Sequence, residues 1–209
     1  RVLPDIRRAL QAFKTDVCVC VMFNASLWGR LAAASLGCPV VVAEHSTTGT
    51  VRTVERLTNI VLDNVTETVI ACAANQVDSL ILAGHRRRKI HVVRNGVDTR
   101  HFSRDAEGAK KMRAELSLPP DIPIVMLVAA HRPEKRHDRF LRLVEHLHST
   151  GTRVGGVMVG GGPLLEDTKA LAEASSVSDW VRVIGPVADM RAAYSTADVV
   201  VLLSDDIET

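Results

Sequence analysis

The sequence predicts an α/β protein that is built on parallel β-sheets and divided into two domains. Short apolar runs rich in β-branched residues alternate with stretches of helical periodicity, which is typical of βαβ units. The clearest run, Ile122–Ala130, is apolar throughout, as in a strand buried on both faces of a parallel sheet. The alternation breaks at the Asn-Gly turn within Arg94–Asp98 and restarts at Ile122. We therefore predict domains at residues 1–103 and 104–209.

In the first domain, helices are predicted where apolar residues recur every three or four positions, and strands where they run together. Pro4 suits the first turn of the opening helix, and Gly37 suits the C-terminal cap of the second. A polar, threonine-rich loop follows His45 and leads into a long helical pattern. The expected order is helix Pro4–Phe13, strand Asp16–Phe23, helix Ser26–Leu36, strand Pro39–Ala43, helix Val51–Val65, strand Thr68–Ala73, helix Asn75–Leu82 and strand Lys89–Val93.

The second domain repeats the alternation after a polar stretch with one helix. Its opening strand is followed by a polar turn, and a glycine-rich turn separates a later strand from the next helix. The expected order is helix Gly108–Leu116, strand Ile122–Ala130, helix Asp138–Ser149, strand Arg153–Val159, helix Leu164–Ala174, strand Val181–Ile184, helix Met190–Thr196 and strand Asp198–Leu203.

Composition excludes several classes of function. A net charge of +2 and a pI near 8.5 do not indicate a nucleic-acid-binding protein, and the one basic cluster, His85–Lys89, is interpreted as a solvated helix end. Four cysteines stand in apolar surroundings without zinc-like spacing, so we expect reduced thiols in a cytoplasmic protein. No apolar stretch reaches membrane-spanning length and no signal peptide is recognised. Because the sequence lacks an initiator Met and stops at Thr209, we expect a fragment.

The candidate binding residues follow strands, where open α/β sheets hold their ligands. Arg132 and Lys135 are cations in the turn after the opening strand of the second domain and are candidates for binding an anion such as phosphate. The alternative is a solvated surface turn. His45 directly follows a first-domain strand, and Glu208 follows the last one. A surface position explains His45 equally well, and a carboxylate near a terminus, such as Glu208, is usually solvated.

Two glycine-containing turns are weaker candidates. Gly160–Pro163 lies between a strand and a helix, where backbone N–H groups can receive an anion, but it lacks the spacing of a dinucleotide fingerprint. Gly185–Val187 also follows a strand, and its backbone could meet a base. A plain tight turn is the better explanation of Gly160–Pro163, whereas a simple loop explains Gly185–Val187 equally well. The sequence shows no nucleophilic triad and no metal-binding cluster.

Taken together, these segments resemble the retaining glycosyltransferases of family 4, which have the two-domain GT-B fold. The resemblance is carried by their order along nearly the whole chain: Ile90–Asp98 with Phe102, Arg132–Lys135, Val159–Pro163, Val181–Val187, Tyr194–Ser204 and Glu208. It implies two Rossmann-like parallel-sheet domains that face each other, both incomplete here, with a nucleotide-sugar donor held mostly by the second.

The resemblance also implies roles for single residues. Lys135 matches the lysine that neutralises the donor diphosphate. Ala130 stands where the family has a partner arginine, so Arg132 is the cation expected to take that role. Glu208 matches the first glutamate of the donor motif, which binds sugar hydroxyls, and His45 matches a histidine near the reacting centre.

The remaining expectations concern the nucleotide and the partners. Gly161, Gly162, Gly185 and Val187 are expected to hold the donor nucleotide, which is UDP- or GDP-linked. No metal or other cofactor is expected, and the acceptor (a glycan, a lipid or a small molecule) is not specified. The fragment itself is expected to be inactive, and contact with the inner face of a membrane is left open. The alternatives are a nucleotide-sugar epimerase of the same fold and a non-catalytic sugar-nucleotide-binding module, which Ala130 favours.

Overall fold

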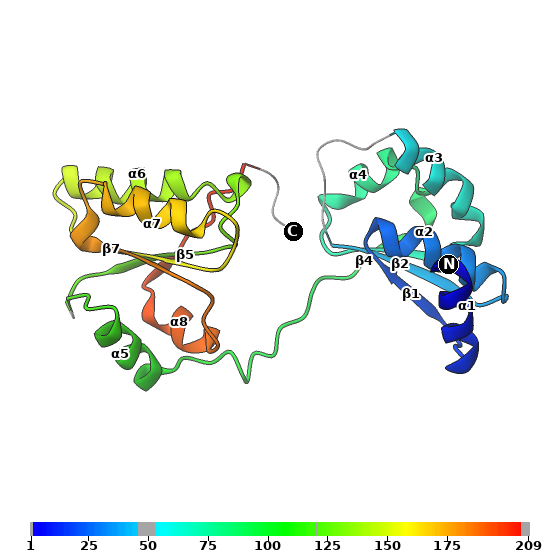
Figure 1. Cartoon of the computed structure of the whole chain (residues 1–209), viewed down its shortest axis with the longest axis horizontal. Coiled ribbons are helices and arrows are strands. Elements are labelled where there is room, and N and C mark those ends of the chain that lie inside the picture. Colours follow the sequence, from blue (N-terminus) through cyan, green and yellow to red (C-terminus); the bar gives the residue numbers. More distant parts are fainter. Residues whose placement is uncertain (1, 46–52, 120, 206–209) are drawn as a thin grey trace. The chain divides into compact units, whose positions relative to one another are not determined.

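The computed structural model of the chain describes residues 2–45, 53–119 and 121–205. Its contacts divide these residues into two compact units, with the division between Gly96 and Val97. Each unit is a parallel β-sheet with helices packed on it, so the predicted α/β class is confirmed (Figure 1).

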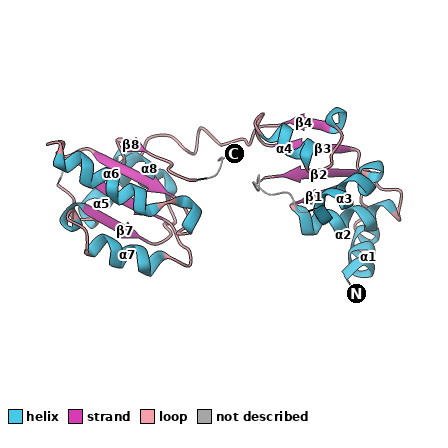
Figure 2. Ribbon diagram, turned by 90° about the horizontal axis from the view of Figure 1, so that it is seen from above, coloured by secondary structure: helices cyan, strands magenta, loops and turns pink. Residues whose placement is uncertain are grey.

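The first unit contains a four-stranded parallel sheet in the order β1-β2-β3-β4, which Figure 2 shows from above. Helices α2, α3 and α4 lie on one side of this sheet (Figure 1). The elements are α1 (Val2–Ala12), β1 (Cys18–Val21), α2 (Phe23–Ala34), β2 (Val40–Glu44), α3 (Thr53–Leu62), a 3₁₀ turn (Asp63–Val65), β3 (Thr68–Ala71), α4 (Gln76–Leu82), a 3₁₀ turn (Arg87–Lys89) and β4 (Ile90–Val92).

The core of the first unit lies between the sheet and these helices. Cys18 and Cys20 alternate with exposed Val19 and Val21 along β1, so that both thiols point to the helical side. Gly29 of α2 lets this helix approach the sheet, because a Cβ there would lie 2.4 Å from the Cys20 sulfur atom. All four cysteines are free thiols, as predicted.

The second unit contains a parallel sheet in the order β7-β6-β5-β8. Helices α6 and α7 cover one face and helices α5 and α8 the other (Figure 1). The elements are α5 (Ala106–Glu115), β5 (Ile124–Val128), a 3₁₀ turn (Pro133–Lys135), α6 (His137–Ser149), β6 (Gly155–Val159), α7 (Leu165–Glu173), a 3₁₀ turn (Ser178–Trp180), β7 (Val181–Ile184), α8 (Met190–Thr196) and β8 (Val199–Val200).

Strand β5 is buried on both faces, as its composition predicts. Val125 and Leu127 belong to the core under α6 and α7, whereas Ile124 and Met126 belong to the core under α5 and α8. Strand β5 is shorter than predicted, because the chain leaves the sheet after Ala129. It then folds back in a turn, in which the Arg132 N–H donates to the Ala130 carbonyl, 2.8 Å away.

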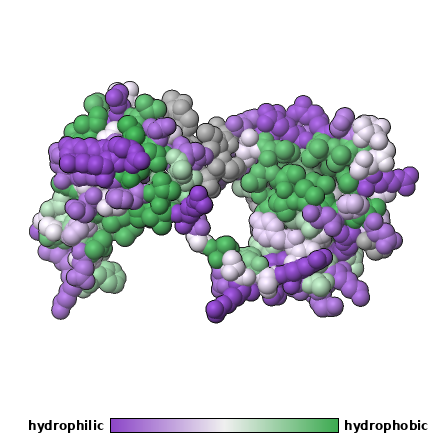
Figure 3. Space-filling view, turned by 180° about the vertical axis from the view of Figure 1, so that it is seen from behind, coloured by the Kyte–Doolittle hydropathy of each residue, from purple (hydrophilic) through white to green (hydrophobic). Residues whose placement is uncertain are grey.

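Apolar side chains are exposed on both units (Figure 3). They include side chains of one edge strand in each sheet: Val19 and Val21 of β1, and Val199 and Val200 of β8. Such edges leave backbone hydrogen-bonding groups available to a further strand. No helix in the described part of the chain is long and apolar enough to cross a bilayer.

The basic cluster after α4 corrects one sequence interpretation. His85–Lys89 was expected to be a solvated helix end, but His85 is buried, and two cations of the cluster surround the buried carboxylate of Asp63. The Arg86 Nε lies 3.1 Å and the Lys89 Nζ 3.9 Å from an Asp63 oxygen. Burial, followed by the charge of Arg30, lowers the pKa of His85 to about 4, so it is neutral near pH 7. A buried carboxylate needs positively charged partners. Arg86 and Lys89 are far from Asp63 in the sequence, so local sequence patterns do not predict these ion pairs.

Candidate functional site

The candidate site in the second unit is formed by the loops that follow β5, β6 and β7. The β5 loop carries Arg132 and Lys135 on a short 3₁₀ turn that begins at Pro133. Arg132 is exposed and Lys135 is half-buried. The Lys135 N–H donates to the Arg132 carbonyl, 3.1 Å away, so one tight turn fixes the spacing of the two predicted cations. The structure thus brings both residues to one place at the carboxyl end of β5.

The glycine loop after β6 lies directly against the β5 loop. The His131 N–H donates to the Gly161 carbonyl (2.8 Å), and the Leu164 N–H donates to the His131 carbonyl (3.0 Å). Gly162 has a φ of +145°, and a Cβ on it would lie 2.7 Å from the His131 backbone. The glycine is therefore required for close backbone contact, which explains the turn without any ligand.

The loop after β7 completes this cluster of loops. A Cβ on Gly161 would lie 3.0 Å from the Pro186 ring, so the β6 and β7 loops are neighbours. Gly185 has open space around its α-carbon, which leaves its backbone accessible. Val187 is half-buried and packs on the core beneath α5 and α8. The structure therefore brings the predicted residues Gly161, Gly162, Gly185 and Val187 to the same edge of the sheet as Lys135.

Arg136, at the end of the 3₁₀ turn in the β5 loop, holds this loop in place. Arg136 was not identified as a site residue from the sequence. It has a left-handed backbone (φ 52°, ψ 51°), which is uncommon for a non-glycine residue. Its guanidinium donates to both carboxylate oxygens of Asp205 (2.9 and 3.0 Å) and to both oxygens of Asp138 (each 2.9 Å). The Asp205 N–H also donates to the Glu134 carbonyl, 2.9 Å away. The β5 loop is thereby joined to the segment that follows β8. These hydrogen bonds raise the pKa of Arg136 and lower that of Asp138.

Two buried histidines lie at the ends of the β5 loop. The rings of His131 and His137 stack with centroids 4.0 Å apart. Thr168 donates its hydroxyl hydrogen to the Leu164 carbonyl, so the His131 Nδ1, 3.1 Å from that hydroxyl, must be the donor. Burial, followed by the charge of His131, lowers the pKa of His137 to about 4. Both Nε2 atoms are buried without a hydrogen-bond partner in the described residues. Neutral imidazoles are the forms that this environment favours.

In the first unit, His45 lies at the carboxyl end of β2 and is exposed. Its Nδ1 is 3.0 Å from the Cys72 sulfur atom at the end of β3. The neighbouring Glu44 has its pKa raised to about 7, mainly by burial and then by the charge of Glu55. A pocket of about 520 Å³ opens beside Cys72, between the ends of β3 and β4.

One predicted site residue cannot be placed. Glu208 lies outside the described residues, so its predicted role in binding the donor sugar is not tested. The described chain ends at Asp205, whose contacts with Arg136 and Glu134 are given above.

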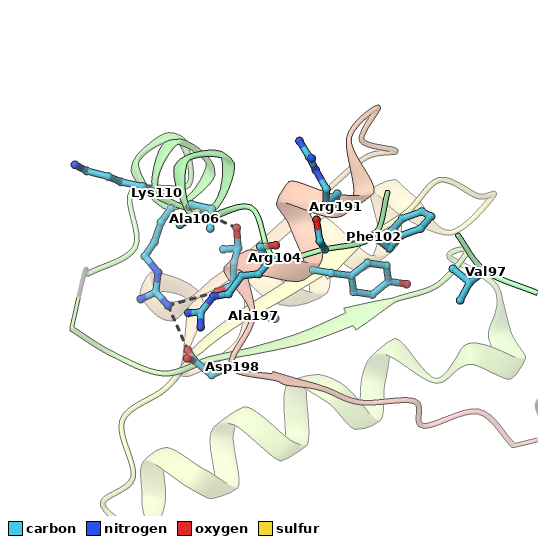
Figure 4. Close-up of a pocket in the computed structure, with 14 residues that line it drawn as sticks. Val97, Phe102, Arg104, Ala106, Lys110, Arg191, Ala197 and Asp198 are labelled. Carbon is cyan, nitrogen blue, oxygen red and sulfur yellow. Dashed lines mark hydrogen bonds and ion pairs between the residues drawn. The ribbon is translucent and has the colours of Figure 1, made fainter. Parts of the chain in front are cut away.

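A second pocket, of about 1100 Å³, lies between α5 and α8 and was not predicted (Figure 4). Four cations line it, two of which are paired: Arg113 with Asp198 (3.3 Å) and Arg191 with Asp105 (3.1 Å). Val97 and Phe102 lie toward one end, away from Lys110 (Figure 4). Seven of its lining residues belong to the segments that carry the family resemblance, namely Val97, Phe102, Tyr194, Ser195, Thr196, Ala197 and Asp198, but nothing in those segments predicts a pocket. The remaining lining residues are brought together by the packing of two helices far apart in sequence.

Comparison with known families divides the chain as the fold does. Residues 1–101 match the model described as Glycosyltransferase Family 4, and residues 109–209 match the model described as Glycosyl transferases group 1. Together the two models span nearly the whole chain.

Single relatives and structures agree with these matches. The chain is 27% identical over 136 residues to the "Putative glycosyltransferase EpsF" of Bacillus subtilis (strain 168), covering 64% of this chain and 35% of that protein. It is 31% identical over 149 residues to the "D-inositol 3-phosphate glycosyltransferase" of Xylanimonas cellulosilytica, covering 66% and 35%. The chain thus spans about a third of the length of these relatives.

A solved structure shows the same fold. The crystal structure of Anabaena Alr3699/HepE in complex with UDP superposes with a TM-score of 0.84 and 19% identity, covering 98% of this chain and 58% of that one. The superposition extends over both units of the present chain.

Proposed function

Because this chain belongs to the family-4 type of glycosyltransferases with the GT-B fold, we propose that it is part of an enzyme that transfers a sugar from a nucleotide-sugar donor to an acceptor. The donor is UDP- or GDP-linked, and the anomeric configuration is retained. The proposed location is the cytoplasm, with the acceptor a glycan, a lipid or a small molecule.

The observation that carries the proposal is the fixed position of Lys135. Its 3₁₀ turn is joined by backbone hydrogen bonds to the glycine loop through His131 and to the segment after β8 through Glu134. A cation held at the carboxyl end of a parallel strand lies where open α/β sheets bind phosphates. As the sugar–phosphate bond breaks, negative charge develops on the leaving diphosphate. Lys135 and Arg132 stabilise this charge without reorganising, in the place that a metal takes in other phosphate sites.

The other predicted residues receive roles consistent with this geometry. Gly161 and Gly162 shape the loop beside the diphosphate, and Gly185 and Val187 offer backbone groups to the base. His45 and Glu208 contact the donor sugar. We assign no side-chain nucleophile. The acceptor attacks the sugar from the same face from which the phosphate leaves, and the leaving phosphate takes the acceptor's proton.

Donor binding tests the proposal most directly. Titration with UDP and GDP should show binding of one nucleotide, and Lys135→Ala should weaken it about tenfold or more, because a charge-assisted contact to phosphate is lost. The matched control is Lys111→Ala, which removes an exposed lysine of α5 in the same unit. Unchanged affinity in Lys135→Ala, or an equal loss in the control, would remove Lys135 from the donor site.

Incubation of the full-length protein that contains this chain with UDP- and GDP-sugars separates this function from its alternatives. Transfer to an acceptor with retained configuration, followed by NMR of the product, supports the glycosyltransferase. Conversion of the donor into an epimeric sugar nucleotide supports an epimerase. Binding without any turnover supports a sugar-nucleotide-binding module.

A further inference from the structure

The four cysteines of the chain have different surroundings. Cys18 and Cys20 are buried in the core of the first unit, and burial raises the pKa of Cys20 to about 12. Cys38 is half-buried, and its sulfur atom lies 3.6 and 3.7 Å from the carbonyl oxygens of Thr15 and Pro39. Among the described residues, none of these three thiols has a basic side chain within hydrogen-bonding distance. Cys72 differs from them in this respect.

Cys72 is placed beside a base and at the wall of a pocket. The imidazole Nδ1 of His45 lies 3.0 Å from its sulfur atom, closer than the Glu44 carbonyl oxygen at 3.4 Å. The backbone N–H groups of Cys72 and Ala73 donate to the buried Gln76 side-chain oxygen, which fixes the position of Cys72 at the start of the turn.

The adjoining pocket gives access to this thiol and supplies a positive charge. Its volume is about 520 Å³, and its lining consists of Cys72, Ala73, Ala74, Asn75, Arg94 and Asn95. Arg94 is exposed and has no ion pair with another described residue. An imidazole within hydrogen-bonding distance of a thiol can take up its proton during reaction, and the thiolate is the form that attacks electrophiles and oxidants.

We propose that Cys72 is a modification site of this protein: a thiol activated by His45 that peroxides oxidise to a sulfenic acid. The proton of the Cys72 thiol passes to the His45 Nδ1, and the sulfur attacks one oxygen of hydrogen peroxide. The S–O bond forms while the O–O bond breaks, and the leaving hydroxide takes the proton from His45 to give water. Sulfur is oxidised and peroxide is reduced, so thiol plus peroxide gives sulfenic acid plus water.

Oxidation of Cys72 also has a consequence for the proposed sugar transfer, and this consequence alone rests on the proposed function. A sulfenic acid at Cys72 changes the group that contacts the His45 ring. His45 is proposed to touch the donor sugar, so sugar transfer by the full-length protein should fall on peroxide treatment and recover when a thiol reductant restores Cys72.

Adduct mapping tests the site without any donor or acceptor. The chain is treated with hydrogen peroxide at pH 7 in the presence of dimedone, which traps sulfenic acids, and each cysteine peptide is quantified by mass spectrometry over time. Cys72 should be labelled about tenfold faster than Cys38, despite its lower exposure, because in the described part of the chain Cys72 has an adjacent base and Cys38 has none. Cys18 and Cys20 should stay unlabelled while the unit is folded.

Two variants decide whether His45 is the cause. His45→Gln keeps a polar side chain of similar size but removes the base, and should lower Cys72 labelling to the rate of Cys38 or below. His91→Ala, which removes an exposed histidine of β4 in the same unit, should leave the rate unchanged. Labelling of Cys38 as fast as Cys72, or a rate in His45→Gln equal to or above that of the parent chain, overturns the proposal.

Discussion

Replacing Gly162 by alanine should destabilise the second unit, whereas the same change at the neighbouring Gly161 should not. Gly162 has a φ of +145°, and its new Cβ would lie 2.7 Å from backbone atoms of His131, which cannot move without breaking the link to Gly161. Gly161 has no such positive φ, and its Cβ would meet the Pro186 ring at 3.0 Å, a contact that a small ring shift relieves.

The size of the effect follows from opposing contributions. An alanine held in a glycine-only backbone region costs about 1–3 kcal/mol, to which the backbone clash adds. The loss of chain freedom in the unfolded state offsets about 0.4–1 kcal/mol of this. We expect Gly162→Ala to lower the free energy of unfolding by about 2 kcal/mol, and Gly161→Ala to change it by less than about 1 kcal/mol.

Urea denaturation monitored by tryptophan fluorescence measures the difference. The chain has two tryptophans, one in each unit, so a Trp28→Phe background leaves Trp180 as the reporter of the second unit. A loss of about 2 kcal/mol corresponds to a midpoint lower by about 1–2 M urea. Equal midpoints for the two variants would refute the assignment of Gly162 to close backbone contact.

Three further predictions concern charged and titratable groups. The depressed pKa of His137 means that the unfolded chain binds a proton more readily than the folded one. The free energy of unfolding should therefore fall by up to about 3 kcal/mol as the pH decreases from about 6.5 to about 4. In His137→Phe, urea midpoints of the second unit should lose much of this pH dependence. Asp63→Asn should destabilise the first unit by about 2 kcal/mol at pH 7, measured by the same method, because it removes the buried partner of Arg86. Arg136→Gly should be more stable than Arg136→Ala in thermal unfolding, since both lose the ion pairs but only glycine accepts the left-handed backbone; the reverse order would contradict this explanation.

The elements of the fold were predictable because their patterns are local. Val181–Ile184 and Met190–Thr196 have the bounds expected from the sequence. The apolar run Ile122–Ala130 was correctly assigned to a strand buried on both faces, although the strand covers only Ile124–Val128. Periodicity marks a strand but not the point at which the chain leaves the sheet, which is decided by hydrogen bonds with neighbouring loops.

The surroundings of the site were less predictable, because they depend on contacts between distant residues. Arg136 adopts a backbone conformation that composition would assign to glycine, and it is held there in part by Asp205, which lies 69 positions further along the chain. The stacking of His131 on His137 likewise depends on how the β5 loop closes. The position of Cys72 beside His45 depends on the register of β2 and β3, in which Glu44 is paired with Ala71.

The way the β5 loop is held makes a change at Lys135 a test of charge rather than of folding. The loop is joined to its neighbours by the backbone groups of His131 and Glu134, and to Asp205 by the side chain of Arg136. These bonds do not involve the side chain of Lys135, so the turn keeps its backbone contacts in Lys135→Ala. An Arg136 variant, in contrast, changes the link to the segment after β8 and can weaken donor binding by moving the loop. Urea midpoints and nucleotide affinity for both variants therefore separate a residue that supplies charge from one that supplies position. Lys135→Ala should lose affinity with a smaller fall in midpoint than Arg136→Ala, which should lose both.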